Sequence, residues 1–270
     1  MDDPAFQAPA SHAETFHRGA GAYQRGIAAF TRVTAEQLLA PVPIRSGDVL
    51  VDLGTGPGPV VAAALARGAS SIGVDRAHGM LLQARDHVLG SRWVRASGTE
   101  LPFAVASADV IAAAYAYGCI APGGRISAEL LRVLRPGGYL AFTNWIPGEC
   151  MNVQILARSV ESFGDPGVPA PTAYPPWLFP DEKAYVSVVC SRGLAAGRVE
   201  KRSLIWSMSS PYELFDSLLE INPRLQGHSH SHLANIREAT ADHVRTYAQG
   251  EHFAVPMGIM FGWARRTDGE

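Results

Sequence analysis

The sequence predicts an α/β protein built on a doubly wound, mostly parallel sheet of seven strands, with N-terminal helices and a cap of helix and loop. Two observations predict this class. Short apolar runs alternate with helix-like segments, and no internal repeat or low-complexity tract interrupts them. Hydrophobic residues make up 47% of the 270 residues, which is enough for an ordinary buried core. A repeated strand, helix and strand indicates parallel pairing through right-handed crossovers.

The first half of the chain contains most of this alternation. Its apolar runs are expected to be strands buried on both faces, at residues 49–53, 71–74, 93–96, 109–114 and 139–144. Its helices are expected at residues 60–66, 77–88 and 127–134, and the last is stopped by the sequence RPGG.

The regular alternation of expected strands and helices ends after Trp145. Residues 164–180 hold six of the 19 prolines, so they are expected to form a stiff irregular loop. Helices are then expected at 181–192, 211–220 and 233–249, and strands at 198–207 and 253–265. Proline after a serine cap makes Ser210–Pro211 a typical helix start. The two late strands are expected to complete the same sheet.

Charge and cysteine content narrow the range of partners. The 23 basic and 25 acidic residues give a net charge of −2, so no global field attracts nucleic acid or an anionic membrane. No apolar run is long enough to cross a bilayer, and the acidic N-terminus lacks the apolar centre of a signal peptide. Cys119, Cys150 and Cys190 are widely spaced and odd in number, which favours reduced thiols. A cytoplasmic protein, monomeric or homodimeric, is expected.

A glycine-rich turn follows the first expected strand, within the sequence VLVDLGTGPGPV. Gly54, Gly56 and Gly58 permit positive φ angles and let a ligand approach the main chain at the start of a helix. Their spacing is GxGxG, whereas dinucleotide enzymes use GxGxxG. Asp52 directly before the turn would repel a phosphate and suits a cationic group such as an ammonium.

Five motifs in order over residues 48–145 resemble the class I S-adenosylmethionine-dependent methyltransferases, in particular the small-molecule branch of ubiquinone and menaquinone biosynthesis. The turn matches the family's DxGxGxG loop, and Asp75 in IGVDRAHGML lies where the family binds both ribose hydroxyls. The other three are GTELPF (98–103), which is similar to the adenine-side loop, ADVI (108–111), and ELLRVLRPGGYLAF (129–142).

The resemblance implies S-adenosyl-L-methionine as cofactor and a division of one domain, residues 1–270, into four parts. These parts are an N-terminal helical cap (1–47), a cofactor-binding core (48–146), a cap insertion (147–195) and C-terminal strands and helices (196–270). The cofactor is assigned to Asp52, Gly54, Thr55, Gly56, Gly58, Asp75, Arg76, Met80, Ser97, Gly98, Thr99, Ala114 and Tyr115. The chain departs from the family at Ser97, where an aspartate commonly accepts from the adenine amino group. Arg76 is an alternative partner that can stack on the adenine.

The acceptor is expected to be a small apolar or aromatic metabolite, methylated on oxygen, nitrogen or carbon. In-line transfer needs mainly positioning, and a base only where the acceptor loses a proton. His17 is the candidate base, and the candidate acceptor contacts are Tyr23, Tyr117, Trp145 and Trp177. Residues 147–180, which include Trp177, are expected to close over the acceptor with the N-terminal helices, or to dock permanently as core.

Two other functions remain open at this point. One is a cyclase, an isomerase or a binding module that keeps the cofactor on the same scaffold. The other is a nicotinamide-dependent oxidoreductase, against which the GxGxG spacing argues. Three alternating histidines in GHSHSH (227–232) would share one face of an extended chain, but a solvated loop between helices is expected there and no metal is assigned.

Overall fold

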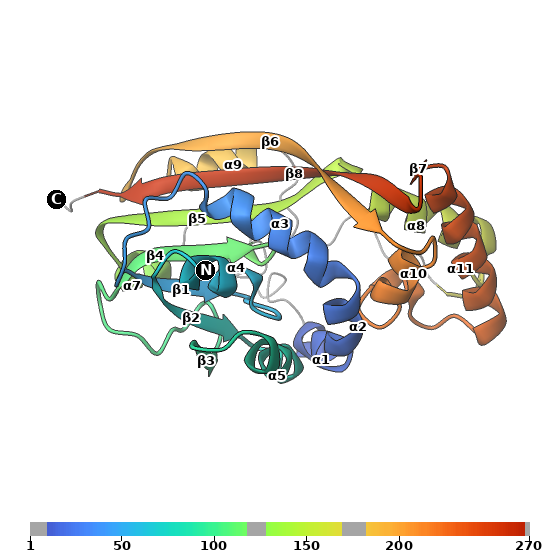
Figure 1. Ribbon diagram of the computed structural model, residues 1–270, viewed down its shortest axis with the longest axis horizontal. Helices are drawn as coiled ribbons and strands as arrows, with labels where there is room; N and C mark the ends of the chain where they lie inside the picture. Colours follow the sequence, from blue (N-terminus) through green and yellow to red (C-terminus); the bar gives the residue numbers. More distant parts are fainter. Residues whose placement is uncertain (1–9, 118–127, 169–181, 268–270) are drawn as a thin grey trace.

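The computed structural model describes residues 10–117, 128–168 and 182–267. Strands form one sheet in the order β3-β2-β1-β4-β5-β8-β6, and the short β7 pairs with β8 (Figure 1). β3, β2, β1, β4 and β5 pair in parallel, whereas β8 is antiparallel to both β5 and β6. The strands are β1 Val49–Leu53, β2 Ser70–Asp75, β3 Arg92–Arg95, β4 Ala108–Ala114, β5 Leu134–Cys150, β6 Leu194–Met208, β7 Ala248–Gln249 and β8 His252–Arg266. The predicted mostly parallel sheet is confirmed, with β7 as a two-residue addition.

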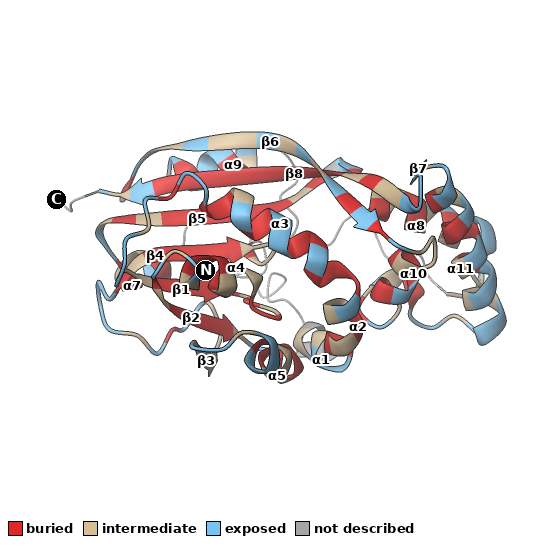
Figure 2. Cartoon of the chain, viewed as in Figure 1, coloured by how far each residue is buried: buried red, intermediate tan, exposed pale blue. Residues whose placement is uncertain are grey.

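Helices cover both faces of this sheet (Figure 1). Those described are α1 Ala10–Arg18, α2 Ala20–Arg25, α3 Ile27–Leu39, α4 Pro59–Leu65, α5 His78–His87, α7 Ala128–Val133, α8 Met151–Phe163, α9 Glu182–Val189, α10 Glu213–Leu218 and α11 His230–Arg245, with a 3₁₀ turn η2 at Pro223–Leu225. Burial follows the strand alternation in β1: Leu50 packs with α3 and α4, whereas Val51 and Leu53 pack with α7 and α9 on the other face. Figure 2 shows the buried residues concentrated along the strands and on the inner sides of the helices.

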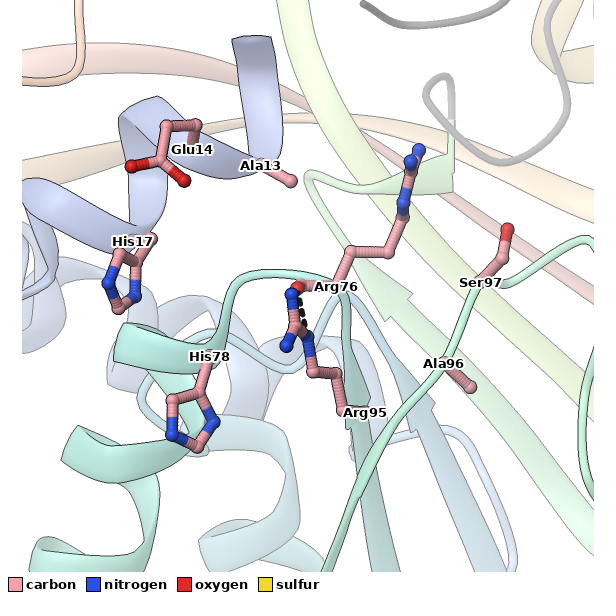
Figure 3. Close-up of a pocket in the computed structure, with 8 residues that line it drawn as sticks. All are labelled: Ala13, Glu14, His17, Arg76, His78, Arg95, Ala96 and Ser97. Atoms are coloured by element: carbon pink, nitrogen blue, oxygen red, sulfur yellow. Dashed lines mark hydrogen bonds between the residues drawn. The ribbon is translucent and has the colours of Figure 1, made fainter. Parts of the chain in front are cut away.

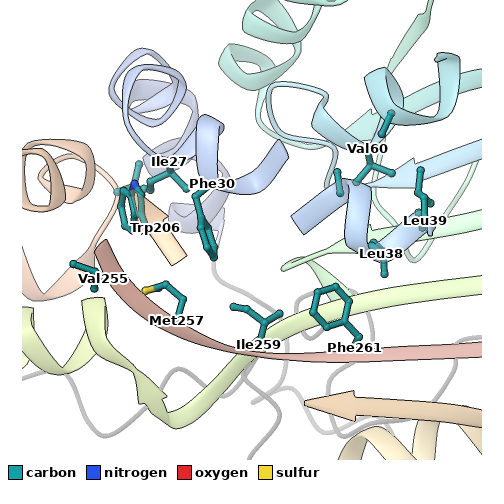
Figure 4. Packing of buried hydrophobic residues seen from close by; sticks show 14 of the residues in the cluster. Ile27, Phe30, Leu38, Leu39, Val60, Trp206, Val255, Met257, Ile259 and Phe261 are labelled. Carbon is teal, nitrogen blue, oxygen red and sulfur yellow. The ribbon is translucent and has the colours of Figure 1, made fainter. Parts of the chain in front are cut away.

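The first of these faces carries one extended core. It includes Leu38 and Leu39 of α3, Val60 of α4, Phe261 of β8 and Trp206 of β6 (Figure 4). The same cluster reaches α8, α10 and α11, which pack where β5, β6 and β8 run on past the parallel strands. The strands and helices up to β4 and those from β5 onward therefore share a continuous apolar interior.

Two sequence expectations about these elements are wrong, and one helix was not expected. β3 is an edge strand with both ends exposed, so it is not buried on both faces. β5 is 17 residues long and includes RPGG, where the register with β4 shifts between Ala108 and Val110. α8 has no counterpart among the expected helices; it lies just before the irregular loop expected at 164–180, and Asn152, Ile155, Leu156 and Ser159 form its buried stripe.

The histidine-rich segment also differs from its expected loop. α11 starts at His230, because the Ser229 hydroxyl accepts from His232 N and caps the helix. His230 and His232 therefore lie in a helix and not on one face of an extended chain. The described ranges contain no group of three His, Cys, Asp or Glu side chains that could hold a metal ion. In the same ranges, no helix has the length and apolar character needed to cross a membrane.

Candidate functional site

The three glycines of the turn after β1 have different surroundings. All have positive φ, at 64° for Gly54, 53° for Gly56 and 87° for Gly58. A Cβ on Gly54 would lie 2.2 Å from the Ala116 Cβ, and one on Gly58 would lie 2.8 Å from the Trp93 ring. A Cβ on Gly56 would meet nothing within 4 Å. Packing thus requires glycine at the first and third positions, whereas the backbone at Gly56 faces open space.

Asp52 lies at the end of β1, directly before this turn. It is 1% exposed, and neither carboxyl oxygen has a hydrogen-bond partner among the described residues. Burial raises the pKa of Asp52 to about 8; the nearby Thr55 hydroxyl opposes the rise without forming a well-aligned hydrogen bond, and the charge of Asp75 adds to it. A buried carboxyl without donors is unfavourable unless a cation or donor reaches it. Asp52 therefore has the character of a ligand-binding group.

Asp75 ends β2 on the neighbouring strand and is tied to the same turn. Its Oδ2 accepts from Gly56 N at 2.9 Å, and its Oδ1 accepts from Ala77 N at 2.8 Å. Burial raises the pKa of Asp75, and these backbone donors lower it. Each carboxylate oxygen can accept a second hydrogen bond, so the pair of ribose hydroxyls predicted from sequence is compatible with this arrangement.

A cavity of about 590 Å³ opens at Arg76, the residue that follows Asp75 in the chain (Figure 3). α1 forms one wall, the turn from β2 into α5 forms another, and the end of β3 forms the third. The lining residues are Ala13, Glu14, His17, Arg76, His78, Arg95, Ala96 and Ser97. Arg95 Nε donates to the Arg76 carbonyl at 3.2 Å, and the Arg76 side chain extends between α1 and the segment that carries Ser97 (Figure 3). Two predicted cofactor contacts, Arg76 and Ser97, are thus brought to one cavity.

The expected adenine-side loop follows β3. The hydroxyls of Ser97 and Thr99 lie 2.7 Å apart, and Ser97 Oγ also accepts from Thr99 N, so the loop closes on itself around Gly98. The next residues are held by α7: Leu101 N donates to Glu129, and Arg132 donates to the Leu101 and Phe103 carbonyls.

Glu129 and Arg132 were not identified as site residues from the sequence. Their ion pair, with Nε to Oε2 at 2.7 Å, lowers the pKa of Glu129 to about 2, and a hydrogen bond from Leu101 N helps. The i, i+3 spacing of opposite charges in ELLR was the available signal. The pair acts on the loop backbone and has no side chain in the cavity lining.

His17 belongs to α1 and meets the start of α5. Its Nδ1 accepts from Gly79 N at 2.8 Å, and its ring stacks on His78 with centroids 6.2 Å apart. Since Nδ1 is engaged as an acceptor, the neutral ring carries its proton on Nε2. A catalytic role for His17 stays a prediction.

Aromatic side chains lie above the carboxyl end of β4. Tyr115 has a φ of 61°, which is unusual for a residue other than glycine. Its hydroxyl is 2.7 Å from Thr34 Oγ1, and its ring stacks on Trp145 with centroids 4.1 Å apart. Phe30 stacks on Trp145 from α3, at 5.7 Å. Burial raises the pKa of Tyr115 well above its usual range, so its hydroxyl stays protonated.

The other predicted contacts are distributed around this group. Tyr23 packs near Ala77 and Met80 and meets Phe16 edge-on at 6.2 Å; burial and the charge of Asp75 raise its pKa. Ala114 ends β4 beside Tyr115. Tyr117 is fully buried and stacks on Phe142, so it lies on the opposite side of β5 from Trp145. Trp177 and Cys119 lie outside the described residues.

Comparisons with known proteins agree with this geometry. Residues 51–142 match the family described as "Methyltransferase domain". The chain is 32% identical over 136 residues to malonyl-[acyl-carrier protein] O-methyltransferase of Pectobacterium atrosepticum, over 50% of this chain and 53% of that protein. The chain spans between 30% and 53% of the length of such curated relatives.

Solved structures share the fold at low sequence identity. Haemonchus contortus phosphoethanolamine N-methyltransferase 2, in complex with phosphomonomethylethanolamine and S-adenosylhomocysteine, superposes with a TM-score of 0.58 at 16% identity, over 93% of this chain and 58% of that one. The [4+2]-cyclase SpnF gives 0.54 at 18% identity, over 88% and 82%. At these identities the likeness establishes the Rossmann-like methyltransferase fold, which both a methyltransferase and a cyclase use.

Proposed function

For a chain whose residues 51–142 form a methyltransferase domain, we propose S-adenosylmethionine-dependent transfer of a methyl group to a small molecule. The observation that carries the proposal is Asp52: it is a buried carboxyl without a hydrogen-bond partner among the described residues, and the strand that carries it leads into a turn whose Gly56 faces open space. A ligand that presents a cation to Asp52 and touches the backbone at Gly56 matches this pair. A pyrophosphate does not, since Asp52 would repel it.

The residues present fit this cofactor. Asp52 and the backbone at Gly56 would hold the ammonium end, Asp75 would accept from the ribose hydroxyls, and Arg76, Ser97 and the Gly98–Thr99 backbone would face the adenine. When bound, S-adenosylmethionine would supply a methyl group already activated by its sulfonium. The remaining assigned residues would shape the turn and the start of α5 around the cofactor; these residues are Gly54, Thr55, Gly58 and Met80.

For the acceptor, we propose a small apolar or aromatic metabolite. The stacked rings of Phe30, Tyr115 and Trp145 support this class, because flat apolar surfaces favour aromatic ligands. The protonated hydroxyl of Tyr23 would donate a hydrogen bond to an acceptor, whereas that of Tyr115 is already engaged with Thr34 Oγ1. Neither tyrosine would act as a base. Most of the rate would then come from alignment of the acceptor with the methyl group.

Titration calorimetry with S-adenosylhomocysteine tests the cofactor assignment. We expect the wild type to bind S-adenosylhomocysteine and not NAD. Asp75→Ala should bind S-adenosylhomocysteine about 10-fold or more weakly, because it loses a hydrogen bond to a charged group. Asp86→Ala is the matched control, because Asp86 is exposed on the neighbouring helix and does not line this cavity. Equal affinity of wild type and Asp75→Ala would refute the assignment.

The chemistry needs a second measurement. Incubation of the protein with S-adenosylmethionine and a metabolite extract should yield S-adenosylhomocysteine together with a product heavier by one methylene unit. A cyclase or isomerase on this scaffold would change the acceptor without consuming the cofactor, so conversion without S-adenosylhomocysteine would favour that alternative.

We also propose that the protein acts in the cytoplasm, in secondary metabolism, as a monomer or homodimer without a nucleic-acid partner. The net charge of −2 supports the last point. Cys150 and Cys190 are free thiols, which suits a reducing compartment.

A further inference from the structure

The first turn of α5 lacks a cap from its own sequence. Ala77 occupies the N-cap position and has no side chain that can accept a hydrogen bond. Asp75 accepts a hydrogen bond from the N–H of Ala77, and the N–H of Met80 donates to the Ala77 carbonyl. The N–H of Gly79 needs an acceptor from elsewhere, because the first four N–H groups of a helix have none within it.

His17 supplies that acceptor from a helix 62 positions earlier. Its Nδ1 lies 2.8 Å from Gly79 N, and Gly79 is buried beneath α1. A Cβ on Gly79 would lie 2.2 Å from the His17 carbonyl oxygen and 3.0 Å from Nδ1. The two residues therefore act together: Gly79 lets α1 approach the backbone of α5, and His17 accepts a hydrogen bond from that backbone.

This junction lies at the edge of the cavity proposed for the adenosine part of the cofactor. His17, Glu14 and Ala13 form the α1 wall, and His78 of α5 lies opposite (Figure 3). We propose that His17 is a positioning residue, which fastens α1 over the cofactor cavity by capping α5 through Gly79. The inference rests on the proposed function, because closure matters only if the cavity holds the cofactor.

The chemistry of the imidazole makes this contact reversible. Protonation of Nδ1 converts an acceptor into a donor, which cannot bond to the Gly79 N–H, and places a positive charge at a helix N-terminus, where it is unfavourable. The charged and titratable groups that share the cavity with His17 are Glu14, Arg76, His78 and Arg95. The bond to the Gly79 N–H therefore requires the neutral ring.

A pair of substitutions separates the hydrogen bond from the bulk of the side chain. His17→Asn places an amide oxygen close to the position of Nδ1 and does not titrate, whereas His17→Gln places its amide near Nε2. His87→Gln is the control, since His87 is exposed at the far end of α5 and its Nδ1 bonds to the Gln83 carbonyl of the same helix. Gly79→Ala tests the close approach independently of the histidine.

The first measurement is amide hydrogen exchange at residue 79 without ligand, followed by NMR. We expect slow exchange in the wild type, His17→Asn and His87→Gln, and exchange about 5-fold faster in His17→Gln, as for the loss of one hydrogen bond. In Gly79→Ala, the amides of α1 should exchange faster. Equal exchange at residue 79 in the wild type and His17→Gln would overturn the proposal.

The second measurement is the dissociation constant of S-adenosylhomocysteine. It should rise about 5-fold in His17→Gln and stay within about 2-fold of wild type in His17→Asn. Unchanged affinity in His17→Gln would overturn the closing role, whereas a wild type that binds no S-adenosylhomocysteine would overturn the proposed function and the closing role with it.

Discussion

Asp52 joins two properties that a stable core seldom combines, because it is a carboxyl with almost no solvent contact and no hydrogen-bond partner among the described residues. Its pKa of about 8 leaves it mostly protonated at neutral pH in the ligand-free protein. An ammonium placed beside it would favour the carboxylate. Binding of a cationic ligand should therefore expel a proton from Asp52.

This coupling predicts proton release on binding of S-adenosylhomocysteine at neutral pH. Calorimetry in two buffers with different ionisation enthalpies should give different observed binding enthalpies for the wild type. The difference should shrink as the pH rises through about 8, since Asp52 is then ionised before the ligand arrives. Asp52→Asn is the control, because it keeps the shape and cannot titrate. The same buffer dependence in Asp52→Asn would exclude Asp52 as the source of the proton.

At the scale of elements, the turn between β1 and α4 separates structural from ligand-facing glycines. We expect Gly56→Ala to weaken S-adenosylhomocysteine binding by about 10-fold or more, because its methyl group would occupy the space open to the ligand. The positive φ should in addition cost about 1–2 kcal/mol of folding stability. Gly54→Ala should be much more destabilising, since its methyl group would clash with Ala116 on the β4 side.

Gly90→Ala isolates the backbone cost in this comparison. Gly90 also has a positive φ, 83°, and its Cβ would likewise meet nothing within 4 Å, but it lies in an exposed turn away from the cavity. Thermal unfolding and titration should show similar stability losses for Gly56→Ala and Gly90→Ala, with weaker binding in Gly56→Ala alone. A matching loss of affinity in Gly90→Ala would mean that the effect at Gly56 is conformational.

The elements that sequence predicted well are those with sharp local boundaries. β1 matches residue for residue, because a purely apolar run surrounds Asp52 and a glycine turn follows it. β5 extends at both ends: its start reaches back through RPGG to Leu134, which pairs with Ala108 of β4, and its far end stays paired with β8 as far as Cys150. α8 is hard to predict from the sequence, because two of its four buried positions, Asn152 and Ser159, are polar and weaken the apolar period.

Side-chain chemistry at the site was predictable only where it followed a local motif. Asp52, the three glycines and Asp75 could be placed because a strand, a turn and a helix bring them together. The contact between His17 and Gly79 joins α1 to α5, and no local sequence pattern predicts it. The same is true of Tyr115, whose bond to Thr34 depends on how α3 crosses the sheet.

For the whole molecule, the shared core predicts that the two halves of the chain unfold together. Leu50 of β1 and Val60 of α4 belong to the same buried cluster as Ile236 and Val244 of α11. β8 also runs through both halves, with β5 on one side and β6 on the other. Loss of packing at one end therefore exposes apolar surface at the other, so partial unfolding of the C-terminal helices alone is unfavourable. A single domain over residues 1–270 was the expectation from sequence, and this behaviour tests it.

Ile236→Ala is the informative change, because Ile236 is fully buried in α11 and far along the chain from the glycine turn. It should lower the free energy of unfolding by about 2–5 kcal/mol, the range for large-to-small changes in a core. In hydrogen exchange at increasing urea, peptides from β1 and from α11 should lose protection at one midpoint, and Ile236→Ala should lower both equally. Leu89→Ala, at a side chain that is 83% exposed, should move neither. If α11 loses protection at lower urea than β1, the chain consists of two independently stable units. The sheet around β1 would then stay folded while the C-terminal helices are open.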